Sequence, residues 1–174
     1  MQHALSAGGY SDTGFIDADG AFDIADIVRF IERWKNNAKS NETFDALWSS
    51  RVKLAGRKIE RNGFRHYLSR VIATYLSTAG VDLPYDTQCG FKIFKNNADF
   101  QSVLIEPFNS RWFFDLELLG RMLRINKTFR IYEEPLDSWH DVTGSKINSI
   151  EMLRIVNEIR IIKKYLGNTI KATT

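Results

Sequence analysis

Residues 15–22 read FIDADGAF, and this stretch decides how the chain divides into strands and helices. An apolar run ends at two carboxylates, Asp17 and Asp19, and a glycine follows. Beyond it, apolar residues recur at helical spacing between positions 24 and 34, and Asp23 is a suitable N-cap. We therefore expect a short buried strand over Thr13–Asp17, a turn, and then a helix.

The same alternation continues along the chain. We expect further strands over Phe44–Ser49, Phe91–Phe94 and Thr128–Glu133, and helices over Phe64–Gly80, Ala98–Ile105, Trp112–Ile125 and Ile147–Leu166. Strands that alternate with helices predict an α/β fold with a mainly parallel sheet, here as a single domain over residues 1–174. Ligands of such sheets bind beyond the carboxyl ends of the strands, where Asp17 and Asp19 lie.

Net charge, cysteine count and the length of the apolar runs limit the kinds of ligand and structure that the chain can have. The 174 residues carry a formal net charge of +3, which suits a ligand with phosphate groups or an anionic membrane surface. The single cysteine, Cys89, excludes an intrachain disulfide. No apolar run approaches the ~20 residues of a membrane span.

The Asp17-Ala-Asp19-Gly motif has three interpretations. It is a solvated turn, a calcium loop, or a site for Mg²⁺ or Mn²⁺. A calcium loop beginning at Asp17 requires Gly and Glu at its sixth and twelfth positions, which hold Phe22 and Val28, so it is excluded. Residues i and i+2 of a strand point to one side, so both carboxylates can face one ion. The motif alone does not choose between the turn and the metal site.

Seven Lys and Arg residues lie between Arg51 and Arg70, against the single acid Glu60. They form either a solvated basic face or a phosphate clamp, because Arg binds phosphate oxygens in a forked geometry. Arg65 and Ser69 are four residues apart and share one helix face. The aromatic residues among these cations fall at helical core spacing, and no nucleic-acid motif is present, so we expect no nucleic-acid partner.

The segment YDTQCGF contains Asp86 and Gln88, which can cap a helix, hold a loop or face a substrate. Cys89 beside a glycine is typical of a packed small residue rather than a nucleophile. The late segment GSK ends at Lys146, where backbone N–H groups at a helix start would make an anion seat, although an ordinary loop explains Gly and Ser equally well.

Asp115 and Glu117 stand in the apolar run WFFDLELL. A charge among so many apolar neighbours is costly unless it has a partner. Asp115 is either the N-cap of the helix or an active-site carboxylate.

Taken together, the segments DADGAFDI, SRVKLAG, FRHYLSR, DTQCGFKIF, RWFFDLELL and GSK resemble the family 2 glycosyltransferases that transfer a sugar to a polyprenyl phosphate. The resemblance runs from about residue 15 to about residue 165. It is strongest for the dolichyl-phosphate β-glucosyltransferase branch, with the dolichyl-phosphate mannose synthases next.

The resemblance implies a GT-A fold, with residues 1–50 as the remainder of the donor- and metal-binding half and residues 51–174 as the acceptor-binding half. It implies an inverting transfer of glucose, or less favourably mannose, from UDP-glucose or GDP-mannose to a polyprenyl or dolichyl phosphate at the cytosolic membrane face. The implied residues are Asp17 and Asp19 for Mg²⁺ or Mn²⁺, Arg51, Arg65, Ser69 and Lys146 for phosphate, and Asp86, Gln88, Asp115 and Glu117 for the sugar pocket, with the three acids as catalytic candidates. The alternative is a non-catalytic or truncated module of this fold that binds lipid phosphate or a partner chain.

Two features depart from the family pattern. Ala21 stands where many mannose synthases carry Gln, which favours the glucosyltransferase branch. Only sixteen residues precede Asp17, whereas family members have a nucleotide-binding segment before this strand, and a βαβ unit takes ~30 residues. We therefore expect a fold that is incomplete at its N-terminus, with an exposed sheet edge or a self-associating surface.

Overall fold

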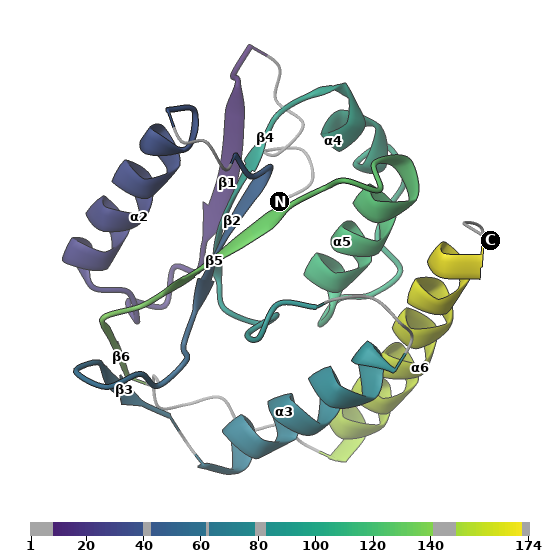
Figure 1. The fold of residues 1–174 in the computed structure, drawn as a ribbon. Coiled ribbons are helices and arrows are strands. Elements are labelled where there is room, and N and C mark those ends of the chain that lie inside the picture. The colour runs from purple at the N-terminus through teal and green to yellow at the C-terminus, as the bar shows by residue number, and fades with distance from the viewer. Residues whose placement is uncertain (1–8, 40–42, 62, 79–82, 141–148, 172–174) are drawn as a thin grey trace.

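The computed structural model describes residues 9–39, 43–61, 63–78, 83–140 and 149–171 (Figure 1). Its strands are β1 (Asp12–Ile16), β2 (Ala46–Ser50), β3 (Lys58–Glu60), β4 (Phe91–Lys95), β5 (Ile131–Pro135) and β6 (Ser138–His140). Its helices are α2 (Ile24–Asn37), α3 (Gly63–Ser77), α4 (Ala98–Val103), α5 (Phe114–Ile125) and α6 (Ser149–Lys171). The strand expected before the aspartate pair is present as β1.

Most expected elements are present with small shifts at their ends, whereas β3 and β6 were not expected. The predicted N-cap is confirmed, because the Asp23 carboxylate accepts a hydrogen bond from the backbone N–H of Ala25 at 2.9 Å. The strand before Asp17 is less buried than expected. Its residues alternate between exposed and half-buried, because β1 lies at an edge of the described sheet.

The main sheet has the strand order β1-β4-β2-β5. β2 and β5 are parallel, but β4 runs antiparallel to both of its neighbours, so the sheet is mixed rather than mainly parallel. β3 and β6 form a separate parallel pair. The direction of β4 matters for function, because residues that precede it meet residues that follow β1 and β2 at one end of the sheet.

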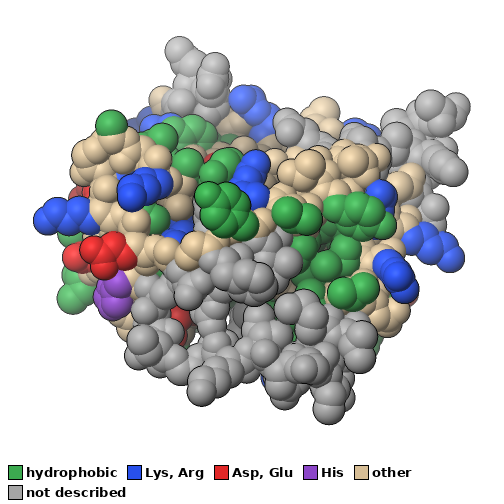
Figure 2. Space-filling view, turned by 90° about the horizontal axis from the view of Figure 1, so that it is seen from below, with side chains coloured by type: hydrophobic (Ala, Val, Ile, Leu, Met, Phe, Trp, Pro, Cys, Tyr) green, Lys and Arg blue, Asp and Glu red, His purple; other side chains and the backbone are tan. Residues whose placement is uncertain are grey.

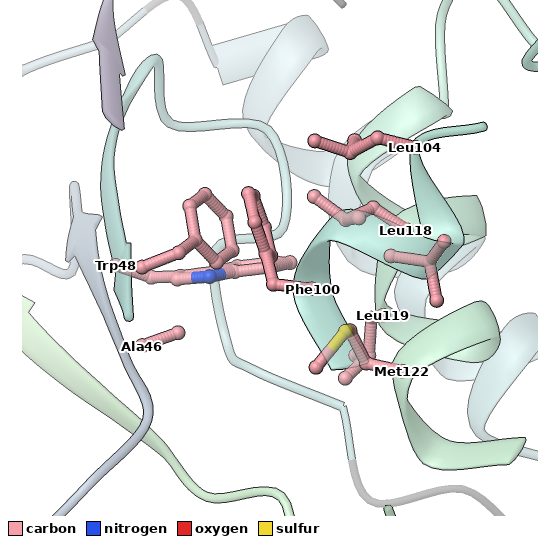
Figure 3. Packing of buried hydrophobic residues seen from close by; sticks show 9 residues of the cluster. Ala46, Trp48, Phe100, Leu104, Leu118, Leu119 and Met122 are labelled. Atoms are coloured by element: carbon pink, nitrogen blue, oxygen red, sulfur yellow. The ribbon is translucent and has the colours of Figure 1, made fainter. Parts of the chain in front are cut away.

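Helices cover both faces of this sheet, with α2 on one side and α4 and α5 on the other (Figure 1). The alternation of side chains along β2 explains the two layers. Trp48 faces the cluster that contains Phe100, Leu118 and Met122, as Figure 3 shows, whereas Leu47 packs with Phe30 beneath α2. A third cluster joins α3, α5 and α6.

Candidate functional site

Asp17 directly follows β1, and its position is set by the first residue before β4. The backbone N–H of Asp17 donates to the carbonyl oxygen of Gly90 at 2.8 Å. Asp19 closes the following turn, because its Oδ1 accepts a hydrogen bond from the backbone N–H of Ala21 at 3.1 Å. Gly20, between Asp19 and Ala21, has a φ of 77°, a conformation that glycine adopts without steric cost.

The carboxyl group of Asp17 is influenced by burial and by several neighbouring charges. Partial burial of its carboxyl group and then the neighbouring charge of Asp19 raise the pKa of Asp17, while Lys92 and Arg51 act in the opposite direction. Two carboxylates that repel each other gain from a divalent cation. Within the described ranges, no group of three or more His, Cys, Asp or Glu side chains lies together as a metal site would require.

Asp86 forms the second part of the site. Its carboxylate accepts two hydrogen bonds from the guanidinium of Arg51, at 2.7 Å and 2.8 Å, and a third from the Arg51 backbone N–H at 3.0 Å. Arg61 Nη1 lies 3.7 Å from the same carboxylate. Burial opposes ionisation of Asp86, but the bonds and charge of Arg51, helped by Arg61, outweigh it and lower the pKa of Asp86 to about 2.

The loop that carries Asp86 is also held from β5. The carboxylate of Glu133 accepts hydrogen bonds from the backbone N–H groups of Tyr85 and Asp86 at 2.8 Å and 2.7 Å. Sequence reasoning did not single out Glu133. Its position in a short strand gave no signal, because the contact joins residues 47 and 48 positions apart.

Lys92 is a buried cation in β4 that sequence reasoning also missed. Its side chain is 0% exposed, donates to the carbonyl oxygen of Thr87 at 2.8 Å, and pairs with the carboxylate of Asp115. The ammonium nitrogen lies 4.2 Å from the centroid of the Trp48 ring. The available signal was a lysine inside the apolar run FKIF, where a charge requires a buried partner.

Asp115 therefore belongs with Lys92 rather than at a helix cap. The N-cap position of α5 is occupied by Phe113, which makes no side-chain capping bond, and Asp115 lies in the first turn. Gln88 Nε2 donates to Asp115 Oδ1 at 3.3 Å. The structure thus joins three residues of the predicted sugar pocket, Asp86, Gln88 and Asp115, through the segment that precedes β4.

Glu117 does not join this group. Its carboxylate accepts hydrogen bonds from the backbone N–H groups of Asn109 and Ser110, each at 2.9 Å, and pairs with Arg121 at 2.8 Å. Arg121 in turn donates to three backbone carbonyl groups between residues 103 and 107. Glu117 therefore holds the loop before α5 in place, and its oxygens face protein groups.

Cys89 is buried, as the sequence predicted. Ser49 Oγ lies 2.9 Å from its sulfur, and burial raises the pKa of the thiol to about 11. A thiol with such a pKa is almost entirely protonated near neutral pH, so it is a poor nucleophile.

The remaining predicted phosphate ligands are only partly described. Arg65 and Ser69 lie within α3, but their side chains fall outside the described residues, as does the whole of Lys146. Arg51 is close enough to Asp17 to influence its ionisation. The expected proximity to the first of the basic residues is therefore present for Asp17.

Curated proteins that are similar to this chain share one description. Dolichyl-phosphate β-glucosyltransferase of Saccharomyces cerevisiae is 32% identical over 158 residues, which are 86% of this chain and 46% of that protein. The Homo sapiens protein of that name is 32% identical over 157 residues, 83% of this chain and 45% of its own length. Over most of its own length, the chain is therefore similar to part of the dolichyl-phosphate β-glucosyltransferases.

The Dictyostelium discoideum dolichyl-phosphate β-glucosyltransferase is 29% identical over 154 residues, 83% of this chain and 44% of its own length. The chain thus spans about half the length of the β-glucosyltransferases that it matches. No protein-family model matches it.

Proposed function

We propose that this chain forms the metal- and acceptor-binding part of a GT-A glycosyltransferase that transfers glucose from UDP-glucose to dolichyl phosphate or another polyprenyl phosphate. One observation carries the proposal: Asp17 and Asp19 follow β1 and Arg51 follows β2 at the same end of the sheet, and the charges of Asp19 and Arg51 both act on the Asp17 carboxyl group. This arrangement puts a candidate seat for a cation next to a guanidinium. The relationship to β-glucosyltransferases supports glucose as the sugar.

Asp17 and Asp19 would hold Mg²⁺ or Mn²⁺. The fit rests on the raised pKa of Asp17, to which burial and the charge of Asp19 contribute, because a divalent cation would relieve both effects. Hard carboxylate oxygens suit these ions, which commonly keep only one or two protein carboxylates plus phosphate oxygens. A bound ion would neutralise charge on the departing nucleoside diphosphate.

The acceptor requires no strong base. The second pKa of a phosphate monoester is ~6, so its oxygen is already ionised near neutral pH and can attack the anomeric carbon as the bond to the diphosphate breaks. Asp86, with a pKa of about 2, is too weak a base to take a proton, and Asp115 is paired with Lys92. These acids would therefore orient Arg51, Gln88 and Lys92, while Arg51, Arg65, Ser69 and Lys146 would bind phosphate.

A peripheral position at a membrane is supported by the surface of α3. Tyr67, Val71 and Tyr75 recur every four residues along one side of this helix and are 72%, 66% and 43% exposed. Lys163 of α6 lies 3.7 Å from the centroid of the Tyr75 ring. Figure 2 shows apolar side chains among Lys and Arg on this side of the molecule. None of the described helices has the length and apolar character needed to cross a bilayer.

The test is binding by the 174-residue chain. We expect Mn²⁺-dependent binding of UDP-glucose that is lost in Asp19→Ala, and binding of dolichyl phosphate that is retained in this variant. Asp12→Ala is the matched control, because Asp12 lies at the opposite end of β1 and is exposed. GDP-mannose in place of UDP-glucose tests the choice of sugar.

Binding of dolichyl phosphate without affinity for any nucleotide sugar would reject the enzyme and support the alternative, a module that binds lipid phosphate. Equal Mn²⁺-dependent binding of UDP-glucose by Asp19→Ala and the wild-type chain would reject the metal pair.

A further inference from the structure

Gly90 lies opposite Asp17 in the pairing of β1 with β4. Ile16 pairs with Phe91, and the next step of the same ladder is the hydrogen bond from the Asp17 N–H to the Gly90 carbonyl oxygen at 2.8 Å. Gly90 is buried, and its φ is not in the positive range that Gly9, Gly20 and Gly56 adopt. The backbone at position 90 therefore does not itself require glycine.

What requires glycine at position 90 is the carboxyl group of Asp17. A Cβ atom at this position would lie closer than 3.0 Å to Cγ, Oδ1 and Oδ2 of Asp17, a separation that real Cβ atoms essentially never show. Gly14 in β1 is different, because a Cβ there would meet the backbone carbonyl oxygen of Lys92 at 2.5 Å. The obstacle at Gly14 is the sheet itself, whereas the obstacle at Gly90 is the functional end of one side chain.

The position over Gly90 also determines which groups the carboxylate approaches. Residues two apart in a strand point to the same face, so the space above Gly90 adjoins the side chain of Lys92. A carboxylate displaced from the space above Gly90 would therefore leave the face of the sheet that it shares with Lys92.

We propose that Gly90 is a positioning residue for Asp17: the absence of a side chain at position 90 leaves the space in which the Asp17 carboxyl group lies and from which it can bind a divalent cation. This inference rests on the proposed metal role of Asp17. Because the carboxyl group is the end of a rotatable side chain, Gly90→Ala displaces it without unfolding the chain. The substitution therefore acts on cation binding rather than on the fold.

The experiment measures Mn²⁺ binding by electron paramagnetic resonance, with Mn²⁺ alone as the probe, and thermal unfolding of the same samples. The variants are Gly90→Ala, Asp17→Ala and the double variant, each in the full 174-residue chain. Gly167→Ala in α6 is the matched control, because a Cβ there meets nothing within 4 Å. Loss of a group that orients a metal ligand lowers metal affinity ~10–100-fold, and we expect a loss of this order in Gly90→Ala.

Two further results are expected. Gly90→Ala unfolds cooperatively, as Gly167→Ala does, and Gly167→Ala binds Mn²⁺ like the wild-type chain. The double variant binds Mn²⁺ no more weakly than Asp17→Ala, since both substitutions remove the same ligand. If Gly90→Ala alone fails to fold, recovery of folding in the double variant also supports the proposal, because the two side chains then compete for one space.

The proposal is overturned if Gly90→Ala binds Mn²⁺ like the wild-type chain, if the losses of the two single variants add in the double variant, or if neither the single nor the double variant folds. Failure of the proposed function looks different. In that case the wild-type chain itself shows no Mn²⁺ binding that Asp17→Ala or Asp19→Ala weakens.

Discussion

Arg51 and Asp86 form a two-point ion pair that joins the residue after β2 to the segment before β4, with 2.7 Å from Nε to Oδ2 and 2.8 Å from Nη2 to Oδ1. Forked pairing of this kind fixes the orientation of a guanidinium as well as its position. The Arg51 guanidinium also lies 5.1 Å from the centroid of the Trp139 ring. A residue proposed to bind phosphate is therefore already oriented by the protein.

Asp86→Ala should destabilise the fold strongly. The substitution leaves the Arg51 guanidinium largely buried without its carboxylate, and removal of one partner of a buried pair costs about 3–5 kcal/mol. Urea unfolding measures the free energy, with the exposed Asp12→Ala in β1 as the control. A loss below about 1 kcal/mol, the range of surface pairs, would contradict this account of the pair.

The same pair predicts an acid limit to stability. The pKa of Asp86 falls from 3.8 in the unfolded chain to about 2 in the folded protein, so its contribution is fully present above pH 3.8 and is lost as pH falls towards 2. Linkage puts this contribution at about 2 kcal/mol. The check is urea unfolding at a series of pH values between 5 and 2. The pH dependence over this window should flatten in Asp86→Asn, and an unchanged slope would refute the assignment.

Lys92→Met should be destabilising for the complementary reason. It leaves the Asp115 carboxylate buried and without its cation, at a cost of about 3–5 kcal/mol. Lys95→Met, three residues further along β4, is the control, because its pair with Asp45 is 38% exposed on the lysine side and is worth about 1 kcal/mol or less. Unfolding free energies of both variants decide the comparison.

The double variant Lys92→Met/Asp115→Leu should recover much of the stability lost in Lys92→Met, because it removes the uncompensated charge. Absence of any recovery would show that the cost lies in packing against Trp48 rather than in the charge.

Glu117→Ala should affect folding more than chemistry. The substitution removes the acceptor for the N–H groups of Asn109 and Ser110 and leaves Arg121, which is 8% exposed, without its carboxylate. We expect a loss of about 3–5 kcal/mol in unfolding free energy, against about 0.5 kcal/mol or less for the exposed Glu32→Ala. Full stability together with lost transfer activity would instead make Glu117 a catalytic acid.

Local patterns in the sequence predicted what depends on near neighbours. The helix after the aspartate pair follows from the spacing of its apolar residues. Its N-cap follows from Asp23, whose carboxylate accepts a hydrogen bond from the backbone N–H two residues later. The burial of Cys89 follows from its position beside a glycine, where a small residue commonly packs. The paired strands β3 and β6 were missed because each spans only three residues, too few to show a periodic pattern. Each is stabilised by the other, and the paired residues are 80 positions apart in the sequence.

The partners within the site depend on long-range contacts. Nothing local in FKIF indicates that β4 runs antiparallel to its neighbours, yet this direction brings Gly90 beside Asp17, Lys92 beside Asp115 and Asp86 beside Arg51. A strand's apolar pattern is the same whichever way it runs, whereas its direction determines which ends meet. The sequence therefore identified Asp17, Arg51, Asp86 and Asp115 as candidates, whereas Lys92 and Glu133 were found only through their long-range partners. The pairing of these groups is a property of the folded sheet.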